Sequence, residues 1–375
     1  MKMKKITIFF GIFVTVLLIY NCDHYMGGAG SINNGVPANG FLDSYFLSGS
    51  EEEQEIIKTY FSLLAAETAR QNGSEAALAG HEKFVIIRDI AQIYMSQREY
   101  GRLITFLNRF IHEYPDDPFN TYYLFMIAFA YGQMDAYPMA ALYFDRIVKN
   151  YPDLMIQGNS IHLASLNMLT SIVDDPIKRV WYYEELISRF LSNIDPGPAY
   201  FMLAQAYEAI GEWEMAIRSY TQYLPYTGSN VPGFPNADNH ARHMVSFNNS
   251  ARNWTFPSLE ALVTAIKSAI DAGSSARLLQ YHARVNFFTR TWEGEDDNNS
   301  RTFDLHLADF MRNHRIRYAD ELDINSNANE AYLRTWGWPN SASGWYFYFR
   351  KIHFPLDPDI HGNWEWAGIY YGERF

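Results

Sequence analysis

The sequence is poor in cysteine, in basic residues and in long apolar runs. A single cysteine, Cys22, occurs among 375 residues, so no internal disulfide framework can form. Basic residues number 30 against 42 acidic ones, for a formal charge of −12. This deficit argues against nucleic acid as a partner, because phosphate binding needs basic patches. The apolar run from Ile6 to Tyr20 is too short for a comfortable membrane span.

Motifs of the common catalytic sites are also missing. The chain has no Gly-x-Ser-x-Gly sequence, no phosphate-cradling loop and no dinucleotide-binding fingerprint. Five histidines of the C-terminal part lack paired metal-ligand spacing: His282, His306, His314, His353 and His361. His306 and His314 are eight residues apart, which fits neither an i,i+4 pair nor a His-Glu-x-x-His site. We therefore expect no cofactor, no metal and no enzymatic activity, and an enzyme stays only as a third alternative.

The N-terminus has the pattern of an export signal. Three lysines precede the apolar run, which predicts a signal peptide over 1–21. The stretch Leu18–Cys22 resembles a bacterial lipobox, although Tyr20 and Asn21 replace its small residues. We expect Cys22 to carry the lipid, and 22–49 to be a flexible tether that holds an exported protein on a bacterial membrane, facing the periplasm. An uncleaved anchor and a plain secretory signal remain open alternatives.

Three stretches of the chain repeat one pattern of small, aromatic and apolar residues. Pro115 and Pro152 lie in Tyr-Pro-Asp turns that end a predicted helix, because proline donates no N–H and biases the preceding residue away from helix. Small residues let helices approach closely, and the rings fill the gaps between helix pairs. The matching sets are Ile90, Ala91, Tyr94, Leu103, Leu107, Phe110 and Pro115; Ile127, Ala128, Tyr131, Ala140, Phe144, Ile147 and Pro152; and Leu203, Ala204, Tyr207, Gly211, Ala216, Tyr220 and Tyr223.

This pattern resembles that of the tetratricopeptide-repeat family over residues 83–224. The resemblance implies stacked helical hairpins, which we place at 50–224. A degenerate fourth pair occupies about 158–172 and 176–191, where Asp174-Asp175-Pro176 is typical of a helix start. A helix from Ser50 to about Asn72 reads as an N-terminal cap.

The resemblance also implies a function and a binding surface. The turns are similar to those of bacterial envelope repeat lipoproteins, which implies a non-enzymatic scaffold for protein–protein interaction in an outer-membrane assembly or transporter-associated complex. Family members bind partners along the first helix of each pair, and the expected ligand here is an apolar or amphipathic segment of an envelope protein. The groove positions are Arg88, Gln92, Tyr122, Phe125, Phe129, Phe201, Gln205 and Glu208.

The rest of the chain has a different pattern. Segment 225–257 is rich in Gly, Pro and Asn and predicts a linker or a loop that covers the groove. Residues 258–375 predict a smaller α+β domain of no recognised family, in which a helix starting at Ser258 precedes three aromatic-rich antiparallel strands. The fold class is thus mainly α, a repeat superhelix followed by this domain.

The tryptophans of this domain support an alternative function. Exposed flat rings could form a platform that stacks on sugars or other small ligands, whereas buried rings would simply be core. The alternative to a scaffold is therefore a glycan- or small-ligand-binding protein. The platform residues would be Trp336, Trp338, Trp345, Trp364 and Trp366.

Overall fold

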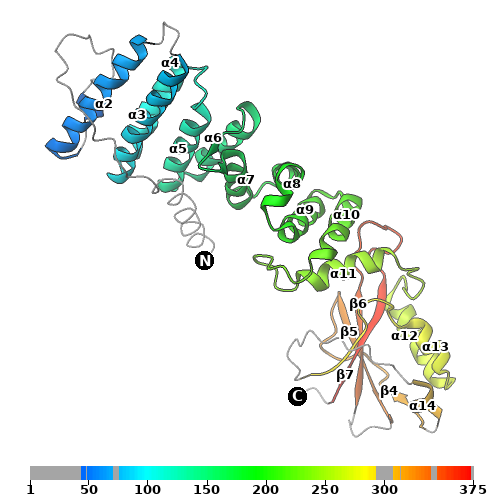
Figure 1. Cartoon of the computed structure of the whole chain (residues 1–375). Coiled ribbons are helices and arrows are strands. Elements are labelled where there is room, and N and C mark those ends of the chain that lie inside the picture. Colours follow the sequence, from blue (N-terminus) through cyan, green and yellow to red (C-terminus); the bar gives the residue numbers. More distant parts are fainter. Residues whose placement is uncertain are drawn as a thin grey trace. The chain divides into compact units, whose positions relative to one another are not determined.

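The computed structural model describes residues 44–47, 49–70, 76–292, 307–312, 314–338 and 344–372 (Figure 1). The predictions for the signal peptide, for Cys22 and for most of the tether lie outside these residues. Contacts divide the chain into two units, Met1–Ile194 and Asp195–Phe375. The last predicted repeat hairpin therefore belongs to the same unit as the C-terminal domain.

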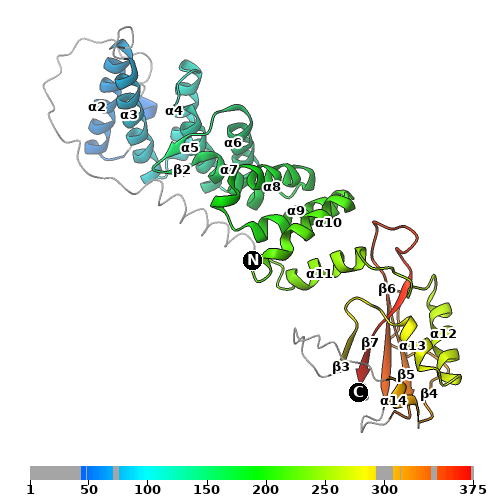
Figure 2. The ribbon, with the colours of Figure 1, turned by 45° about the vertical axis from the view of Figure 1, so that its right-hand side comes forward.

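The first unit is a series of helices in which each helix packs on its neighbours in chain order (Figure 2). The pairs α3/α4, α5/α6 and α7/α8 form the hairpins that the sequence predicts, and α2 is the predicted N-terminal helix. The elements are η1 (Ser44–Phe46), α2 (Glu51–Arg70), α3 (Ala76–Ser96), α4 (Tyr100–Glu113), α5 (Asn120–Gln133), α6 (Tyr137–Asn150), β1 (Met155–Ile156), β2 (Asn159–Ser160), α7 (Ile161–Ile172), α8 (Pro176–Phe190) and η2 (Leu191–Asn193).

Helices α4 and α5 show how the second helix of one hairpin and the first helix of the next differ in composition. Helix α4 is amphipathic and buries one stripe that includes Leu103, Phe106 and Phe110. Helix α5 carries no charged residue and is buried on nearly every side, because it packs on α4, α6 and α7. A helix that is apolar all round fits only such an interior position.

The end of the predicted tether is part of the folded unit. The Phe46 ring is 3% exposed and lies 6.2 Å from the ring of Phe61 and 6.3 Å from that of Phe106. The Tyr94 hydroxyl donates to the Phe46 carbonyl at 2.6 Å. The prediction of a tether through residue 49 is therefore wrong from Ser44 onward, because the buried Phe46 ring supplies an apolar anchor.

The second unit joins a last helical hairpin, α9/α10, to the C-terminal domain. Helix α9 begins at Pro196, where the Asp195 side chain accepts from the Gly197 N–H at 3.1 Å. It ends at Gly211, which takes φ = 82°, a left-handed conformation that glycine adopts without strain. The elements are α9 (Pro196–Ile210), α10 (Trp213–Tyr223), η3 (Leu224–Tyr226), α11 (Ala237–Asn248), α12 (Leu259–Asp271), α13 (Ser275–Tyr281), β3 (Phe288–Thr291), α14 (Leu307–Arg312), β4 (Arg317–Tyr318), β5 (Glu330–Trp336), β6 (Trp345–Lys351) and β7 (Trp364–Tyr371).

Segment 225–257 contains a helix that packs on the repeat hairpin. Helix α11 contacts α10 and buries Ala237, Ala241, Met244 and Val245, which follow helical spacing. The Asp238 carboxylate accepts from the Tyr223 hydroxyl and from the Gly228 N–H, so the turn before the helix is fixed as well. The prediction of a linker is therefore wrong for 237–248, which is a helix. The alternative of a covering segment holds for α9, because the rings of Phe234 and His240 lie 5.1 and 6.0 Å from the ring of Phe201, a predicted groove residue.

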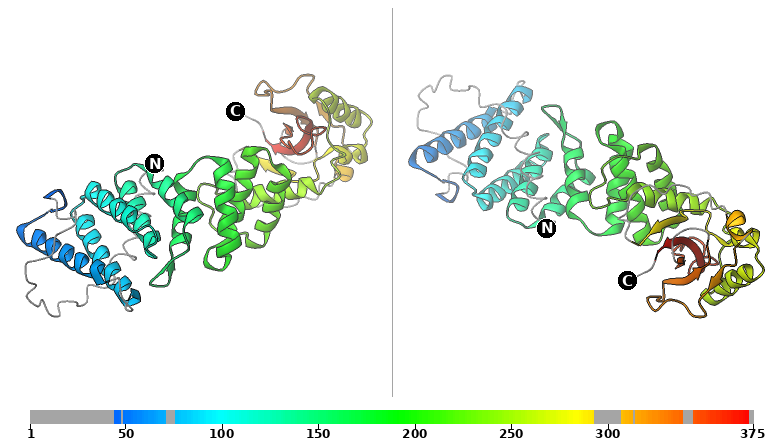
Figure 3. Two further views of the ribbon diagram at one scale, coloured as in Figure 1. Left: turned by 90° about the horizontal axis from the view of Figure 1, so that it is seen from above. Right: turned by 90° about the horizontal axis from the view of Figure 1, so that it is seen from below.

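The C-terminal domain is a mixed sheet with helices on one side (Figure 3). The strand order is β3-β7-β6-β5-β4. Strands β5, β6 and β7 are antiparallel, as the sequence predicts, whereas β3 adds a parallel edge strand beside β7. The chain is thus mainly α, with helical hairpins followed by a smaller α+β domain.

The two faces of this sheet differ in chemistry. Residues Leu333, Phe347 and Ile369 lie on the face that packs against α12, where Leu262 and Ile266 are also fully buried. Ser258 caps α12 by accepting from the Ala261 N–H at 3.1 Å. The opposite face carries a second cluster of buried residues, Tyr332, Tyr346, Tyr348 and Ala367, with Phe288, Trp292 and Tyr370 packed against it.

Candidate partner-binding surface of the helical hairpins

The four rings predicted to line the groove are core residues. The exposed fractions are 2% for Tyr122, 3% for Phe125, 7% for Phe129 and 0% for Phe201. Burial also raises the pKa of the Tyr122 hydroxyl to about 12. A ring in this environment presents no face to a partner, so the prediction that these rings anchor a ligand is wrong.

Ring contacts account for this burial. Phe125 lies 5.5 Å from Phe144 of α6, and Tyr122 lies 5.3 Å from Phe84 of α3. Phe201 of α9 contacts Tyr220 and Tyr223 of α10 at 5.5 and 5.4 Å. The repeat register identifies which face of a first helix points toward its neighbours. In this protein the neighbouring helices cover the rings on that face.

The predicted polar groove residues of the first unit are half-buried. The Arg88 guanidinium contacts the Asp89 carboxylate through Nη2 at 2.8 Å and through Nε at 3.0 Å. The Tyr60 hydroxyl of α2 donates to the same Asp89 carboxylate at 3.3 Å. Gln92, one turn further along α3, is half-buried as well. Arg88 therefore serves α2–α3 packing through Asp89.

In the second unit, the predicted residues Gln205 and Glu208 of α9 meet a residue of α11 that the sequence analysis did not select. We call Gln205, Glu208, Tyr220 and His240 the α9–α11 polar cluster. Gln205 donates to Glu208 Oε2 at 3.1 Å and to the Tyr220 hydroxyl. His240 Nε2 lies 3.0 Å from the Tyr220 hydroxyl and 3.7 Å from Glu208 Oε1. Three helices thus bring their polar side chains to one place.

Exposure divides this cluster into a buried base and an accessible rim. Tyr220 is fully buried, and burial together with the nearby Glu208 carboxylate raises the pKa of its hydroxyl. In contrast, the His240 side chain is 43% exposed and that of Glu208 is 18% exposed. A partner can therefore reach an imidazole and a carboxylate that are already held in place by Tyr220 and Gln205.

The tryptophans predicted as a ligand platform lie mostly in the core of the sheet domain. Trp338 stacks on Trp345 with ring centroids 4.2 Å apart, and Trp366 stacks on Phe347 at 4.4 Å. Trp364 is 7% exposed, and only Trp336 is half-buried. These rings gain their stability from packing in the core. The platform prediction is therefore wrong for four of the five residues.

In the ranges that the structure describes, no group of three or more His, Cys, Asp or Glu side chains could hold a metal ion. Likewise, no helix within those ranges is both long enough and apolar enough to cross a bilayer.

Two of the hairpins match models of a known protein family. A tetratricopeptide-repeat family model matches residues 122–154, which span α5, α6 and the turn after them. A second model of the same description matches residues 199–231, which span most of α9 and all of α10. The chain contains tetratricopeptide repeats. No curated protein and no solved structure matches it.

The second tetratricopeptide match ends just before the helix that completes the polar cluster. Gln205, Glu208 and Tyr220 lie inside the matched residues, whereas His240 of α11 lies beyond them. Helix α11 extends the hairpin by one more layer, and its Ala237–Val245 spacing is the sequence signal that could have revealed it. The polar cluster thus includes a helix that lies outside the matched residues.

Proposed function

We propose that this tetratricopeptide protein is a non-enzymatic scaffold that docks a segment of another protein on the α9–α11 polar cluster. Repeats of this family serve protein–protein interaction, and the observation that carries the site is the accessible Glu208–His240 rim on a fixed base. The ligand that this rim favours is a polar segment that brings a Lys or Arg side chain to the Glu208 carboxylate. Such a charge pair supports specificity and association rate more than raw affinity.

We further propose that the scaffold is exported and held on a bacterial membrane by a lipid on Cys22, facing the periplasm. Support comes from the sequence: a basic start, a short apolar run and a lipobox-like stretch that ends at the single cysteine. An outer-membrane assembly or transporter-associated complex is the setting that this arrangement favours. The partner would then be an envelope protein.

A site-specific cross-link tests the docking surface. A photo-reactive residue is placed at His240 in the full chain, and at Arg218 as a matched control, since Arg218 is exposed on α10. We expect discrete protein adducts from position 240 that weaken with added salt and with Glu208→Gln, and no such adducts from position 218. Equal adducts from both positions, or adducts indifferent to Glu208→Gln, would contradict the proposed surface.

A separate experiment tests the anchor. Cys22→Ser should move the full chain from the detergent phase to the aqueous phase after cell fractionation, and intact-mass analysis should find acyl mass on the wild type alone. A Cys22→Ser protein that stays in the detergent phase would instead favour an uncleaved N-terminal anchor. This result leaves the docking surface untouched, so the two proposals fail independently.

A further inference from the structure

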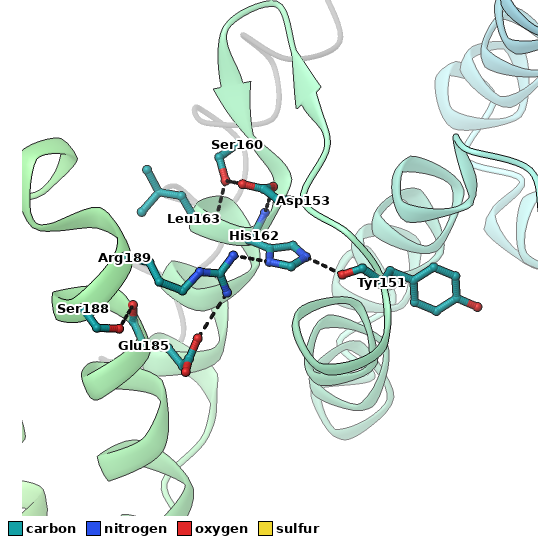
Figure 4. A network of polar contacts seen from close by, with 8 residues as sticks. All are labelled: Tyr151, Asp153, Ser160, His162, Leu163, Glu185, Ser188 and Arg189. Atoms are coloured by element: carbon teal, nitrogen blue, oxygen red, sulfur yellow. Dashed lines mark hydrogen bonds and ion pairs between the residues drawn. The ribbon is translucent and has the colours of Figure 1, made fainter. Parts of the chain in front are cut away.

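His162, in the first turn of α7, joins four parts of the first unit (Figure 4). His162 is buried, with only 4% of its surface exposed. The ring Nε2 lies 3.0 Å from the Tyr151 carbonyl at the end of α6, and Nδ1 lies 2.6 Å from Arg189 Nη2 of α8. Its backbone N–H donates to Asp153 Oδ1 at 3.0 Å. The side chain thus connects the end of α6 to α8, and the backbone N–H connects α7 to Asp153, which precedes β1.

These partners admit one protonation state of the ring. A carbonyl oxygen can only accept, so Nε2 must carry a hydrogen and donate it to Tyr151. A guanidinium can only donate, so Nδ1 must present its lone pair to Arg189. The geometry therefore requires the neutral imidazole with its hydrogen on Nε2. A charged imidazolium would turn an N–H toward a group that is itself charged and can only donate.

The residue types of a hydrolytic triad occur here, but their connections are different. Ser160 Oγ donates to Asp153 Oδ2 at 2.6 Å and accepts from the Leu163 N–H at 3.0 Å, so it caps α7. The nitrogen of His162 that a triad carboxylate would hold faces Arg189 instead. The serine hydroxyl is thus occupied by helix capping, and the ring serves to tie helices together.

The charges around His162 come from the turn, α6 and α8. Asp153 already accepts the Ser160 hydroxyl and the His162 backbone N–H, while Glu185 holds Arg189 at 3.2 Å. On α6, Lys149 pairs with Asp145 at 2.9 Å, and Arg146 donates to the Tyr151 hydroxyl at 3.1 Å. Helix α5, which also contacts α7, carries no charged residue and no histidine.

We propose that His162 is a proton-sensitive joint between α7 and α8, closed when its ring is neutral and opened when Nδ1 takes a proton. On protonation the Nδ1–H and the Arg189 guanidinium become two like-charged donors that face each other. Arg189 then swings away, and its existing partner Glu185 is there to receive it. Helix α8 thereby loses its polar tie to the start of α7. This inference stands apart from the proposed function, because it concerns the first unit alone.

The direction of the pH effect follows from the environment of the ring. Burial, the largest cause, and the Arg189 charge lower the pKa of His162, against the opposing charge of Asp153. The unfolded chain therefore binds a proton more readily than the folded one. The stabilising contribution of the joint is complete above the ordinary histidine value of about 6.5 and is lost as the pH falls below it toward the lowered pKa.

Two measurements on the full chain test the joint. In a ¹⁵N-histidine-labelled protein, NMR should find His162 as the Nε2–H tautomer with a pKa below 6.5. His162→Gln identifies its signal by absence and also serves as the matched variant, because an amide can donate to Tyr151 and accept from Arg189 without titrating. A neutral Nδ1–H tautomer, or a pKa at or above 6.5, would overturn the proposal.

Hydrogen exchange then reports on the helix. After correction for the intrinsic pH dependence of exchange, peptides from α8 should exchange faster at pH 5.5 than at pH 7.5 in the wild type. The increase is at most about tenfold, because pH 5.5 lies one unit below the ordinary histidine pKa of about 6.5. In His162→Gln the same peptides should show no such increase, and peptides from α4 should show none in either protein. An equal increase of α8 exchange in wild type and His162→Gln would rule out the joint.

Discussion

The first Tyr-Pro-Asp turn, at 114–117, and the second, at 151–153, each lead from the second helix of a hairpin to the first helix of the next. In the first turn, Asn120 Nδ2 donates to the Tyr114 and Pro115 carbonyls at 2.8 and 2.9 Å. In the second, His162 donates to the equivalent Tyr151 carbonyl at 3.0 Å. The tyrosine carbonyl of each turn thus accepts a hydrogen bond from a side chain. The donor is the Asn120 amide in the first turn and the His162 imidazole in the second.

The charged partners differ in the same way. Lys83 of α3 pairs with Asp117 at 2.7 Å, with side chains 5% and 1% exposed, and its ammonium lies 4.9 Å from the centre of the Tyr114 ring. The second turn has Asp153 hydrogen-bonded to Ser160, and Arg189 bonded to His162. The first turn is therefore held by a buried pair of opposite charges, whereas the second depends on one neutral ring. Equivalent turns of one repeat family can respond differently to pH.

The largest expected effect comes from breaking the buried pair of the first turn. Lys83→Met should lower the free energy of unfolding by about 3–5 kcal/mol, because it leaves the Asp117 carboxylate buried without its counter-charge. Chemical denaturation measures it, with Lys58→Met as the control. Lys58 pairs with Glu55 at an exposed site, where side chains are 42% and 71% exposed, so its loss should cost about 0–1 kcal/mol.

A double variant sharpens this result. Asp117→Asn added to Lys83→Met should recover part of the lost stability, since the buried charge is then removed while an acceptor remains for the Phe119 N–H, 2.9 Å from Asp117 Oδ1. If Lys83→Met unfolds at the same denaturant concentration as Lys58→Met, the first turn is not held by this pair.

A smaller effect is expected from the amide of the first turn. Asn120→Ala should cost about 1–3 kcal/mol, because the part-buried hydrogen bonds to the Tyr114 and Pro115 carbonyls are both lost. Thermal unfolding at pH 7.5 and at pH 5.5 should give the same loss, since Asn120 does not titrate. The exposed Asn150→Ala is the control. A loss that grows in acid would show that the two turns share one pH-dependent mechanism.

The smallest of the three effects belongs to the second turn. Ser160→Ala should cost about 1 kcal/mol, because α7 loses the cap that accepts from the Leu163 N–H. Equilibrium unfolding measures it, with Ser192→Ala in η2 as the comparison. A cost as large as that of Lys83→Met would mean that the Asp153–Ser160 bond holds the second turn as firmly as the buried ion pair holds the first.

Much of the helical architecture follows from local sequence signals. Pro115, Pro152 and Gly211 mark helix ends whatever surrounds them, and the Ala and Tyr spacing identifies the hairpins. Helix α11 was missed because the Gly, Pro and Asn residues around it dominate the composition and hide the spacing of Ala237, Ala241, Met244 and Val245.

The candidate sites depended on tertiary contacts, which local pattern does not contain. The face of α5 that carries Tyr122 and Phe125 could be assigned from spacing, yet whether other helices cover it could not. Glu208 and Gln205 were selected from the repeat register, but their partner His240 lies 32 residues further on than Glu208 in a helix that was not expected. The two ring nitrogens of His162 acquire their roles only when Tyr151 and Arg189 come together.

Because Phe46 is packed in the folded unit, the tether between a lipid on Cys22 and the helical hairpins ends at Ser44. From Cys22 to Ser44 the chain has 22 residue steps, and a fully extended chain spans at most roughly 3.3–3.6 Å per residue. With the anchor of the proposed function, the start of η1 would stay within about 75 Å of the bilayer surface. The helical hairpins would therefore begin within this distance of the bilayer. A membrane-bound partner would have to present its docking segment within their reach.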